Sequence, residues 1–246
     1  MRRLTEIVAL IATLIIPFMT NISLAKSFSP ILNQTHLWQT AEGADVYHLP
    51  LEELPIVDII IALDVGDYHS GPQHGVATLT ASLLGKSAGP YDEEALLEAL
   101  EERQTLLSTR VSSNKTLFTF RTRSVSDGKT HTITDEAKDL ITTLFAEPRF
   151  DEQIFLRERA NIIDAQKARL DNINAIASEI YYQNLYPNEY LGVTSEMFQE
   201  ALAELTLSDL KQFHRQYYHA TNAKIIIVGK ISHENAADLA RTISLH

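Results

Sequence analysis

The chain has no cysteine among its 246 residues, so it cannot carry a lipid-modified cysteine anchor. The absence of a stray thiol also fits an oxidising compartment. Basic residues are few: 21 Lys and Arg stand against 32 Asp and Glu, for a net charge of −11 at pH 7. The nearest approach to a basic cluster is Arg121 with Arg123, which is too small for phosphate binding. The composition therefore argues against a nucleic-acid partner and indicates a charged, solvated surface.

Long apolar runs are also missing. The most apolar stretch covers residues 7–19, about 13 residues, which is short of the ~20 that a membrane-spanning helix needs. Arg2 and Arg3 precede this stretch, and small residues follow at Ser23 and Ala25. This layout predicts a signal peptide over residues 1–25 and an exported, periplasmic chain of residues 26–246 without a transmembrane helix. An uncleaved amphipathic anchor is the alternative.

Metal-binding and nucleophile motifs are absent as well. Nine histidines occur, but no His-x-x-x-His pair. Asp67, His69 and His74 lie close together in a loop that could bind a divalent ion or could be a solvated polar loop. His214 and His219 are five residues apart, roughly 140° around a helix, and cannot share a ligand from one face. No nucleophile elbow supports a Ser–His–Asp triad.

The patterning predicts an α+β layered fold. The β-branched run Ile56–Asp64 predicts a central strand that is buried on both faces. Turn residues 42–45 predict a hairpin between residues 36–40 and 44–49. Further strands are expected at 106–111, 115–124 and 224–228. Helices are expected near 74–84, 92–104, 135–146, 151–170, 175–185, 196–205 and 232–243, with another that Ser208 caps and that carries Leu210 and Tyr217.

Four segments, read together, resemble the pitrilysin/insulinase-type zinc peptidases (inverzincins). They are residues 54–66, 75–84, 146–159 and 205–229, and they occur in the family's order and spacing. The resemblance runs from about Leu37 to Ile243. It implies that residues 26–246 form a single half-domain equivalent to the family's N-terminal half. That half-domain would have a mostly antiparallel sheet with helices packed on one side.

The resemblance also implies that the zinc chemistry is lost. The family's helix carries His-x-x-Glu-His, which presents two imidazoles on one face, with a glutamate that activates water. Thr78, Ala81 and Ser82 stand at those positions, and Ala165 stands where the family's third ligand is counted from Glu158. An alternative register would put Glu158 at the ligand position. Zinc lowers the pKa of its water from 15.7 to about 7, and these side chains cannot replace that effect. We therefore expect no catalytic residue and no cofactor, unless zinc binds at an unrecognised site or through a partner.

One binding feature survives the loss of zinc. In the family, extended substrate pairs with a strand at the cleft edge, and the corresponding residues here are Leu107, Ser108, Thr109, Arg110 and Val111. Strand addition needs only backbone donors and acceptors. Peptide binding at this strand is one expectation, and an internal hairpin strand is the other.

Three functions remain open. The chain could be a non-catalytic subunit that pairs with an active homologous zinc peptidase, or with a second half-domain, and helps to enclose peptide substrate. It could be a stand-alone peptide- or protein-binding module. It could also be a metallopeptidase with a relocated site that uses His69 and His74. The chain ends at His246, where the family's first half ends, whereas a usual subunit continues through a second, similar half. This departure counts against the paired-subunit reading: the chain could be a natural half-subunit, a truncated product or a designed fragment, whose exposed faces would need a partner to cover them.

Overall fold

The structure is a computed structural model, and it describes residues 34–243 except residues 127 and 188. The predicted signal peptide, residues 1–25, lies outside the described residues. From His36 onward the described residues form one compact unit. Among the described residues, no helix is both long and apolar enough to cross a membrane.

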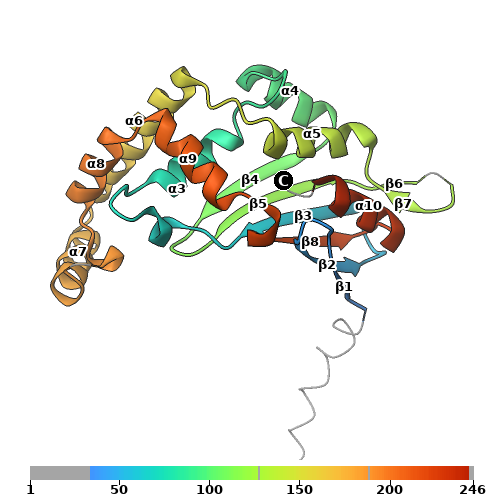
Figure 1. The fold of residues 1–246 in the computed structure, drawn as a ribbon, viewed down its shortest axis with the longest axis horizontal. Coiled ribbons are helices and arrows are strands. Elements are labelled where there is room, and N and C mark those ends of the chain that lie inside the picture. The colour runs from blue at the N-terminus through green and yellow to red at the C-terminus, as the bar shows by residue number, and fades with distance from the viewer. Residues whose placement is uncertain (1–33, 127, 188, 244–246) are drawn as a thin grey trace, which may run out of the picture. The chain divides into compact units, whose positions relative to one another are not determined.

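A six-stranded mixed sheet forms the base of this unit, in the order β1-β2-β8-β3-β5-β4 (Figure 1). All neighbouring strands are antiparallel except β2 and β8, which are parallel. The predicted α+β fold with a mostly antiparallel sheet is confirmed. The strands are β1 (His36–Gln39), β2 (Asp45–Pro50), β3 (Ile56–Leu63), β4 (Leu106–Val111), β5 (Thr116–Arg123) and β8 (Ala223–Gly229), and β6 (Val125–Ser126) pairs separately with β7 (His131–Thr132).

The helices lie over one face of the sheet, as the resemblance implied (Figure 1). They are α3 (Val76–Leu84), α4 (Glu93–Glu102), α5 (Asp135–Ala146), α6 (Glu152–Arg169), α7 (Ile173–Leu185), α8 (Ser195–Glu204), α9 (Leu207–Tyr217) and α10 (His233–Ile243). Short 3₁₀ turns occur at η3 (Asp67–Ser70), η4 (Tyr190–Gly192) and η5 (Ala220–Asn222). The segment 67–73, expected as a loop, therefore contains one turn of 3₁₀ helix.

The one-sided cover corrects the prediction that β3 is buried on both faces. Along β3, fully buried residues alternate with half-buried ones until the last two positions. Val57, Ile59 and Ile61 face the helices and are 0 % exposed, whereas Ile56, Asp58 and Ile60 face away from them. An apolar run of β-branched residues is typical of a strand covered on both faces. Here Ile60 fills the uncovered face, and the sequence pattern alone could not reveal this.

A second correction concerns the start of α9. Thr206, rather than Ser208, is the N-cap residue: its hydroxyl accepts from the Asp209 amide, and the Asp209 side chain accepts from the Thr206 amide. This reciprocal pair is a capping box, which satisfies two amides that the helix leaves free. The sequence pattern also favours caps at Asp92 and Ser232, where the expected helices begin, and both are confirmed: the side chains accept hydrogen bonds from the Ala95 and Asn235 amides.

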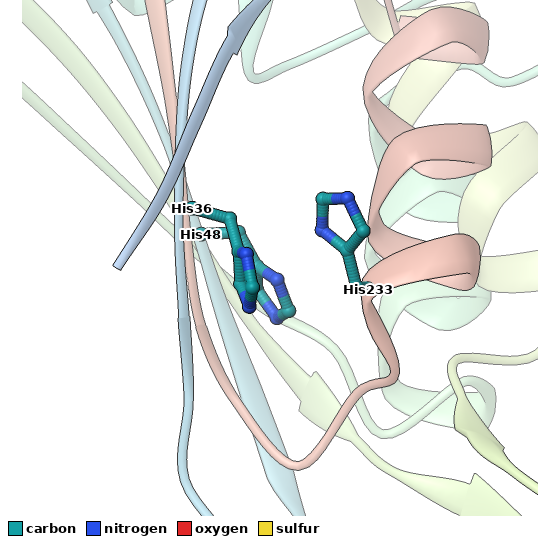
Figure 2. A group of neighbouring side chains, drawn as sticks. All are labelled: His36, His48 and His233. Carbon is teal, nitrogen blue, oxygen red and sulfur yellow. The ribbon is translucent and has the colours of Figure 1, made fainter. Parts of the chain in front are cut away.

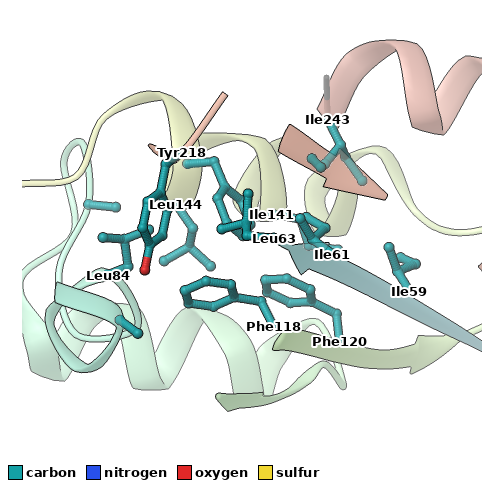
Figure 3. Close-up of a cluster of buried hydrophobic side chains, with 14 of the residues drawn as sticks. Ile59, Ile61, Leu63, Leu84, Phe118, Phe120, Ile141, Leu144, Tyr218 and Ile243 are labelled. Carbon is teal, nitrogen blue, oxygen red and sulfur yellow. The ribbon is translucent and has the colours of Figure 1, made fainter. Parts of the chain in front are cut away.

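The main hydrophobic cluster lies between the sheet and the helices that cover it (Figure 3). Phe118 and Phe120 of β5 point into it, and the Phe118 ring meets Phe145 of α5 edge-to-face, with centroids 5.1 Å apart. Ile141 and Leu144 from α5 close the cluster from above. This core fixes the helix layer on the sheet, and α3 is part of that layer.

Candidate functional site

Helix α3 contains the positions where the resemblance places zinc ligands. It starts at Gly75, whose φ of +86° lies in the left-handed region and so suits glycine. A Cβ at Gly75 would lie 2.8 Å from Leu202 Cδ1 and 2.9 Å from Phe198 Cζ. This glycine therefore lets α3 begin against α8. Ala81, at the position of the family's catalytic glutamate, is 0 % exposed and packs in the core.

Thr78 and Ser82 lie one turn apart on the half-buried face of α3. The Thr78 hydroxyl donates to the Asp67 carboxylate, with Oγ1 3.2 Å from Oδ1. The Ser82 hydroxyl donates to Glu158 of α6, with Oγ 3.0 Å from Oε2. Each hydroxyl at a former ligand position is thus paired with a carboxylate, and neither is left to bind a metal.

Glu158 is also held by cations. Its side chain, only 13 % exposed, lies 3.0 Å from Arg157 and 3.8 Å from Lys86. Arg157 in turn makes a bidentate pair with Glu93 at 2.7 and 2.8 Å, and Lys86 lies 3.2 Å from Glu93. The hydrogen bonds that Arg157 donates to Glu93 lower the pKa of Glu93. Those that it donates to Glu93 and Glu158 raise its own pKa. This ion-pair network ties the C-terminal end of α3 to α4 and α6.

Ala165 is exposed on α6, and Glu158 is the α6 residue that bonds to Ser82. Sequence counting placed Ala165 at the third ligand position and kept Glu158 as an alternative register. The structure brings Glu158 to α3.

These residues do not fit zinc. Zinc in proteins takes imidazole, thiolate or carboxylate ligands in a tetrahedral set. Around α3 the structure offers two hydroxyls and the carboxylates of Asp67 and Glu158, each already hydrogen-bonded. Among the described residues, neither of these carboxylates belongs to a cluster that could hold a metal ion. We derive no metal-assisted step at α3.

The loop that sequence reasoning offered as a relocated metal site does not converge either. Within the described residues, Asp67, His69 and His74 do not bring three ligand atoms together. His69 Nδ1 accepts from the Gly66 amide at 3.2 Å, and Asp67 bonds to Thr78. Burial lowers the pKa of His74 and raises the pKa of Asp67. The loop is built from separate local contacts.

An open cavity of about 410 Å³ lies beside Thr78. Asp67, Thr78 and Tyr190 line it together with Ile162 and Gln166 of α6, and the Tyr190 side chain is hydrogen-bonded to Asp67. Burial, followed by the negative charge of Asp67, raises the pKa of Tyr190, so its hydroxyl stays protonated at neutral pH. The cavity therefore presents a phenol, an amide and a carboxylate next to the former ligand face. Sequence reasoning missed Tyr190, because only the tertiary structure brings η4 to α3.

The expected peptide-binding strand lies at the edge of the sheet. Strand β4 pairs with β5 on one side, and no other described strand pairs with its second side. Ser108, Thr109 and Arg110 are exposed, and Leu107 and Val111 are half-buried. β4 and β5 form a hairpin, as the alternative expected, with β4 as its outer strand. An open edge carries unpaired backbone donors and acceptors, which an extended peptide can use.

Comparisons with known proteins agree with this geometry. A family model described as "Peptidase M16 inactive domain" matches residues 204–244. The mitochondrial presequence protease of Schizosaccharomyces pombe is 25% identical over 230 residues, which cover 86% of this chain and 22% of that protein. The solved structure of a peptidase M16 inactive domain from Pseudomonas fluorescens is 25% identical, with a TM-score of 0.78 over 85% of this chain and 50% of that one. The periplasmic protease PqqL of Escherichia coli shares the fold at 15% identity and a TM-score of 0.69, over 86% of this chain and 24% of that one.

The fold, the order of the motifs and these likenesses point to one class: the chain resembles the pitrilysin/insulinase-type (M16) peptidases and their inactive domains. Thr78, Ala81 and Ser82 stand where the zinc motif of that family would be, so the chain lacks this motif. It spans about half the length of the Pseudomonas fluorescens protein and about a fifth of the presequence protease.

Proposed function

We propose that this chain is a non-catalytic peptidase-like subunit that pairs with an active zinc peptidase of the same family and helps to enclose or present peptide substrate. By itself it would not be an enzyme. The observation that carries this proposal is the pairing of Thr78 with Asp67 and of Ser82 with Glu158. The family scaffold is kept, and its metal-binding face is filled by hydrogen bonds within the chain.

The need for a partner is supported by α7. No residue of this helix is buried, yet it carries a row of large apolar side chains. Ile173 is 79% exposed, Ile180 56% and Tyr181 61%. Exposed apolar surface of this kind marks interaction sites in folded proteins. The solved relative from Pseudomonas fluorescens is twice as long as the matched region, so there the same fold is accompanied by further chain. We propose that an active family member binds the exposed apolar face of α7.

The edge strand β4 supports the substrate role. Residues Leu107–Val111 offer an open backbone edge. A peptide that adds to this edge gains main-chain hydrogen bonds that do not depend on its sequence. The proposed contribution of this chain is therefore to hold extended peptide while the partner supplies the zinc.

Export is the third part of the proposal. The charged and apolar pattern of residues 1–25 supports a signal peptide. The likeness in fold to a protease whose name states that it is periplasmic supports the same compartment.

The test is co-expression with an intact His-x-x-Glu-His family member encoded in the same genome. We expect the two chains to co-elute in size-exclusion chromatography and to cleave a fluorogenic peptide library faster than the active chain alone. The isolated chain should cleave nothing, with or without added zinc. Peptidase activity of the isolated chain that survives a chelator would overturn the proposal.

A matched pair of variants sharpens this test. Ile180→Lys places a charge on the exposed apolar face of α7, and Leu97→Lys places one at an equally exposed site on α4, since Leu97 is 59% exposed and Ile180 is 56% exposed. We expect Ile180→Lys to weaken co-elution at least tenfold and Leu97→Lys to leave it unchanged. Equal effects of the two variants would exclude α7 as the contact.

The open β4 edge also favours a second candidate, a stand-alone peptide-binding module. Fluorescence anisotropy with a labelled extended peptide separates the two. Binding to the lone chain at micromolar concentration, unchanged by an active family member, supports the module. Binding that appears only in the two-chain complex supports the subunit.

A further inference from the structure

A cluster of three histidines lies far along the chain from the former zinc helix. His36 is on β1, His48 is on β2 and His233 is the first residue of α10. In Figure 2 the three imidazoles point toward one another from the two strands and the helix. Among the described residues this is the one group of histidine and acidic side chains placed to hold a metal ion.

The strand register explains why two of the rings meet. His36 and His48 are directly opposed in the antiparallel β1–β2 pair, and opposed residues project their side chains to the same face of the sheet. Strand β8 lies beside β2 and ends at Gly229, and α10 begins shortly afterwards at His233. The start of α10 therefore lies next to the β1–β2 hairpin, which brings His233 close to His36 and His48.

The three rings are close enough for one ion. The His36 and His233 ring centroids lie 4.4 Å apart, and the distances to the His48 ring are 5.7 Å from His36 and 5.8 Å from His233. One nitrogen from each ring lies within 4.8 Å of the others. A tetrahedral zinc with bonds of about 2.0–2.1 Å needs ligand nitrogens roughly 3.3 Å apart. Rotation of the exposed His36 and His233 side chains toward His48 can shorten the nitrogen–nitrogen distances from within 4.8 Å to the roughly 3.3 Å that zinc needs.

The second observation is the state of His48. This residue is 0 % exposed, and among the described residues neither of its ring nitrogens makes a hydrogen bond of standard geometry, although the Ile231 backbone lies near enough to act on its pKa. Buried polar groups in folded proteins are nearly always paired, and an unpaired one calls for an explanation. A phenylalanine at position 48 could stack against His36 equally well and would bury no polar atom. An ion bound to a His48 nitrogen would remove the free-energy cost of burying that nitrogen unpaired.

The donor set selects the ion. Three imidazoles suit zinc, copper or nickel, whereas magnesium and calcium prefer oxygen ligands. Trp38 lines the cluster, with its ring edge-on to His233 at 5.0 Å, so one wall of the cluster is apolar. A fourth ligand position would remain for water.

We propose that His36, His48 and His233 bind one zinc ion, which ties the β1–β2 hairpin to the start of α10. A clip of this kind joins two segments nearly 200 residues apart in a chain without disulfides. An ion that binds only the folded state stabilises that state by RT ln(1 + c/Kd), where c is the free zinc concentration, so the stabilisation grows with the logarithm of that concentration. This site is independent of the function proposed for α3 and β4.

Zinc binding by the full chain, expressed without a histidine tag and freed of metal by a chelator, tests the proposal. Equilibrium dialysis followed by elemental analysis should find one zinc per chain, and thermal unfolding should shift upward with zinc but not with magnesium. X-ray absorption should report nitrogen or oxygen ligands near 2.0 Å. Absence of stoichiometric zinc at micromolar concentration would overturn the proposal.

Variants separate the cluster from the other histidines. His36 and His233 are exposed, so His36→Gln and His233→Gln should fold normally. We expect each to weaken zinc binding at least tenfold and to abolish the thermal shift. His219→Gln is the matched control, because His219 bonds locally to Gln216 and Thr221 and lies outside the cluster. Unchanged affinity in His36→Gln and His233→Gln, or equal loss in His219→Gln, would refute the assignment.

Discussion

Ser82 of α3 donates a hydrogen bond to Glu158 of α6, and the two atoms lie 3.0 Å apart. In the family's active members a histidine at the position of Ser82 would bind zinc. Here the contact joins the same two helices through a hydroxyl and a carboxylate. The helix–helix packing of the peptidase scaffold is therefore retained by a bond that needs no metal.

Removal of this bond should cost stability. Ser82→Ala leaves Glu158 with its cationic partners but without the hydroxyl, and we expect a loss of about 1 kcal/mol in the free energy of unfolding. Urea denaturation measures it. Ser178→Ala on the exposed surface of α7 is the control, and it should change stability by less than about 0.5 kcal/mol. A loss in Ser178→Ala as large as that in Ser82→Ala would contradict the structural role of the contact.

The left-handed start of α3 gives a second prediction. In Gly75→Ala the new methyl group meets Leu202 and Phe198 at less than 3.0 Å, so we expect a loss of roughly 1–3 kcal/mol from overpacking and backbone strain. Gly128 has nearly the same φ, +88° against +86°, but nothing lies within 4 Å of its Cβ position. Gly128→Ala therefore reports the strain alone. If the two variants lose the same stability, the clash with α8 is not significant.

The cap of α9 distinguishes two neighbouring hydroxyls. Thr206→Ala removes the capping box and should lower the free energy of unfolding by about 1 kcal/mol. Ser208→Ala, two residues later, should change it little, because the Ser208 side chain is exposed on the first turn. Thermal unfolding of the two variants ranks them. The reverse ranking would restore Ser208 as the cap.

The buried histidines predict how stability depends on pH. Burial, and secondarily the charge of Arg215, lowers the pKa of His214 to about 4. Burial, and secondarily the charges of His233 and His36, lowers the pKa of His48 to about 4. Between pH 4 and the unfolded value of about 6.5, the unfolded chain holds protons that the native chain lacks. Stability should therefore fall as the pH drops through this window, by up to about 1.4 kcal/mol per pH unit for each group.

His214→Phe isolates one of these contributions. The His214 ring packs against Phe150 and Tyr218, with centroids 5.5 and 4.9 Å away, so an aromatic replacement keeps much of the packing. Urea denaturation at pH 5 and pH 8 should show a smaller loss on acidification for the variant than for the wild-type chain. The same loss in both would show that His214 does not titrate between the two states.

The sequence predicted the local part of the candidate site, on α3, but not the contacts that α3 makes with distant segments. Thr78, Ala81 and Ser82 were identified from local spacing, because a helix fixes which residues share a face. The third position was counted from Glu158 to Ala165 along one helix by the resemblance, and the structure brings Glu158 itself to α3. Tyr190 and Asp67 were not linked by any sequence signal. Two of the three clustered histidines, His36 and His48, lie in the predicted hairpin, each six residues from residue 42.

The sequence by itself determined the element order, the helix caps at Asp92 and Ser232, and the loss of the zinc motif, because each depends on neighbours within a few residues. It also implied the α+β class through the resemblance. The tertiary structure alone decided that helices cover one face of the sheet, that β4 is an open edge, that Glu158 meets Ser82 and that His233 meets His36 and His48. These contacts join residues that are distant along the chain, and their positions depend on how whole elements pack rather than on local backbone preference.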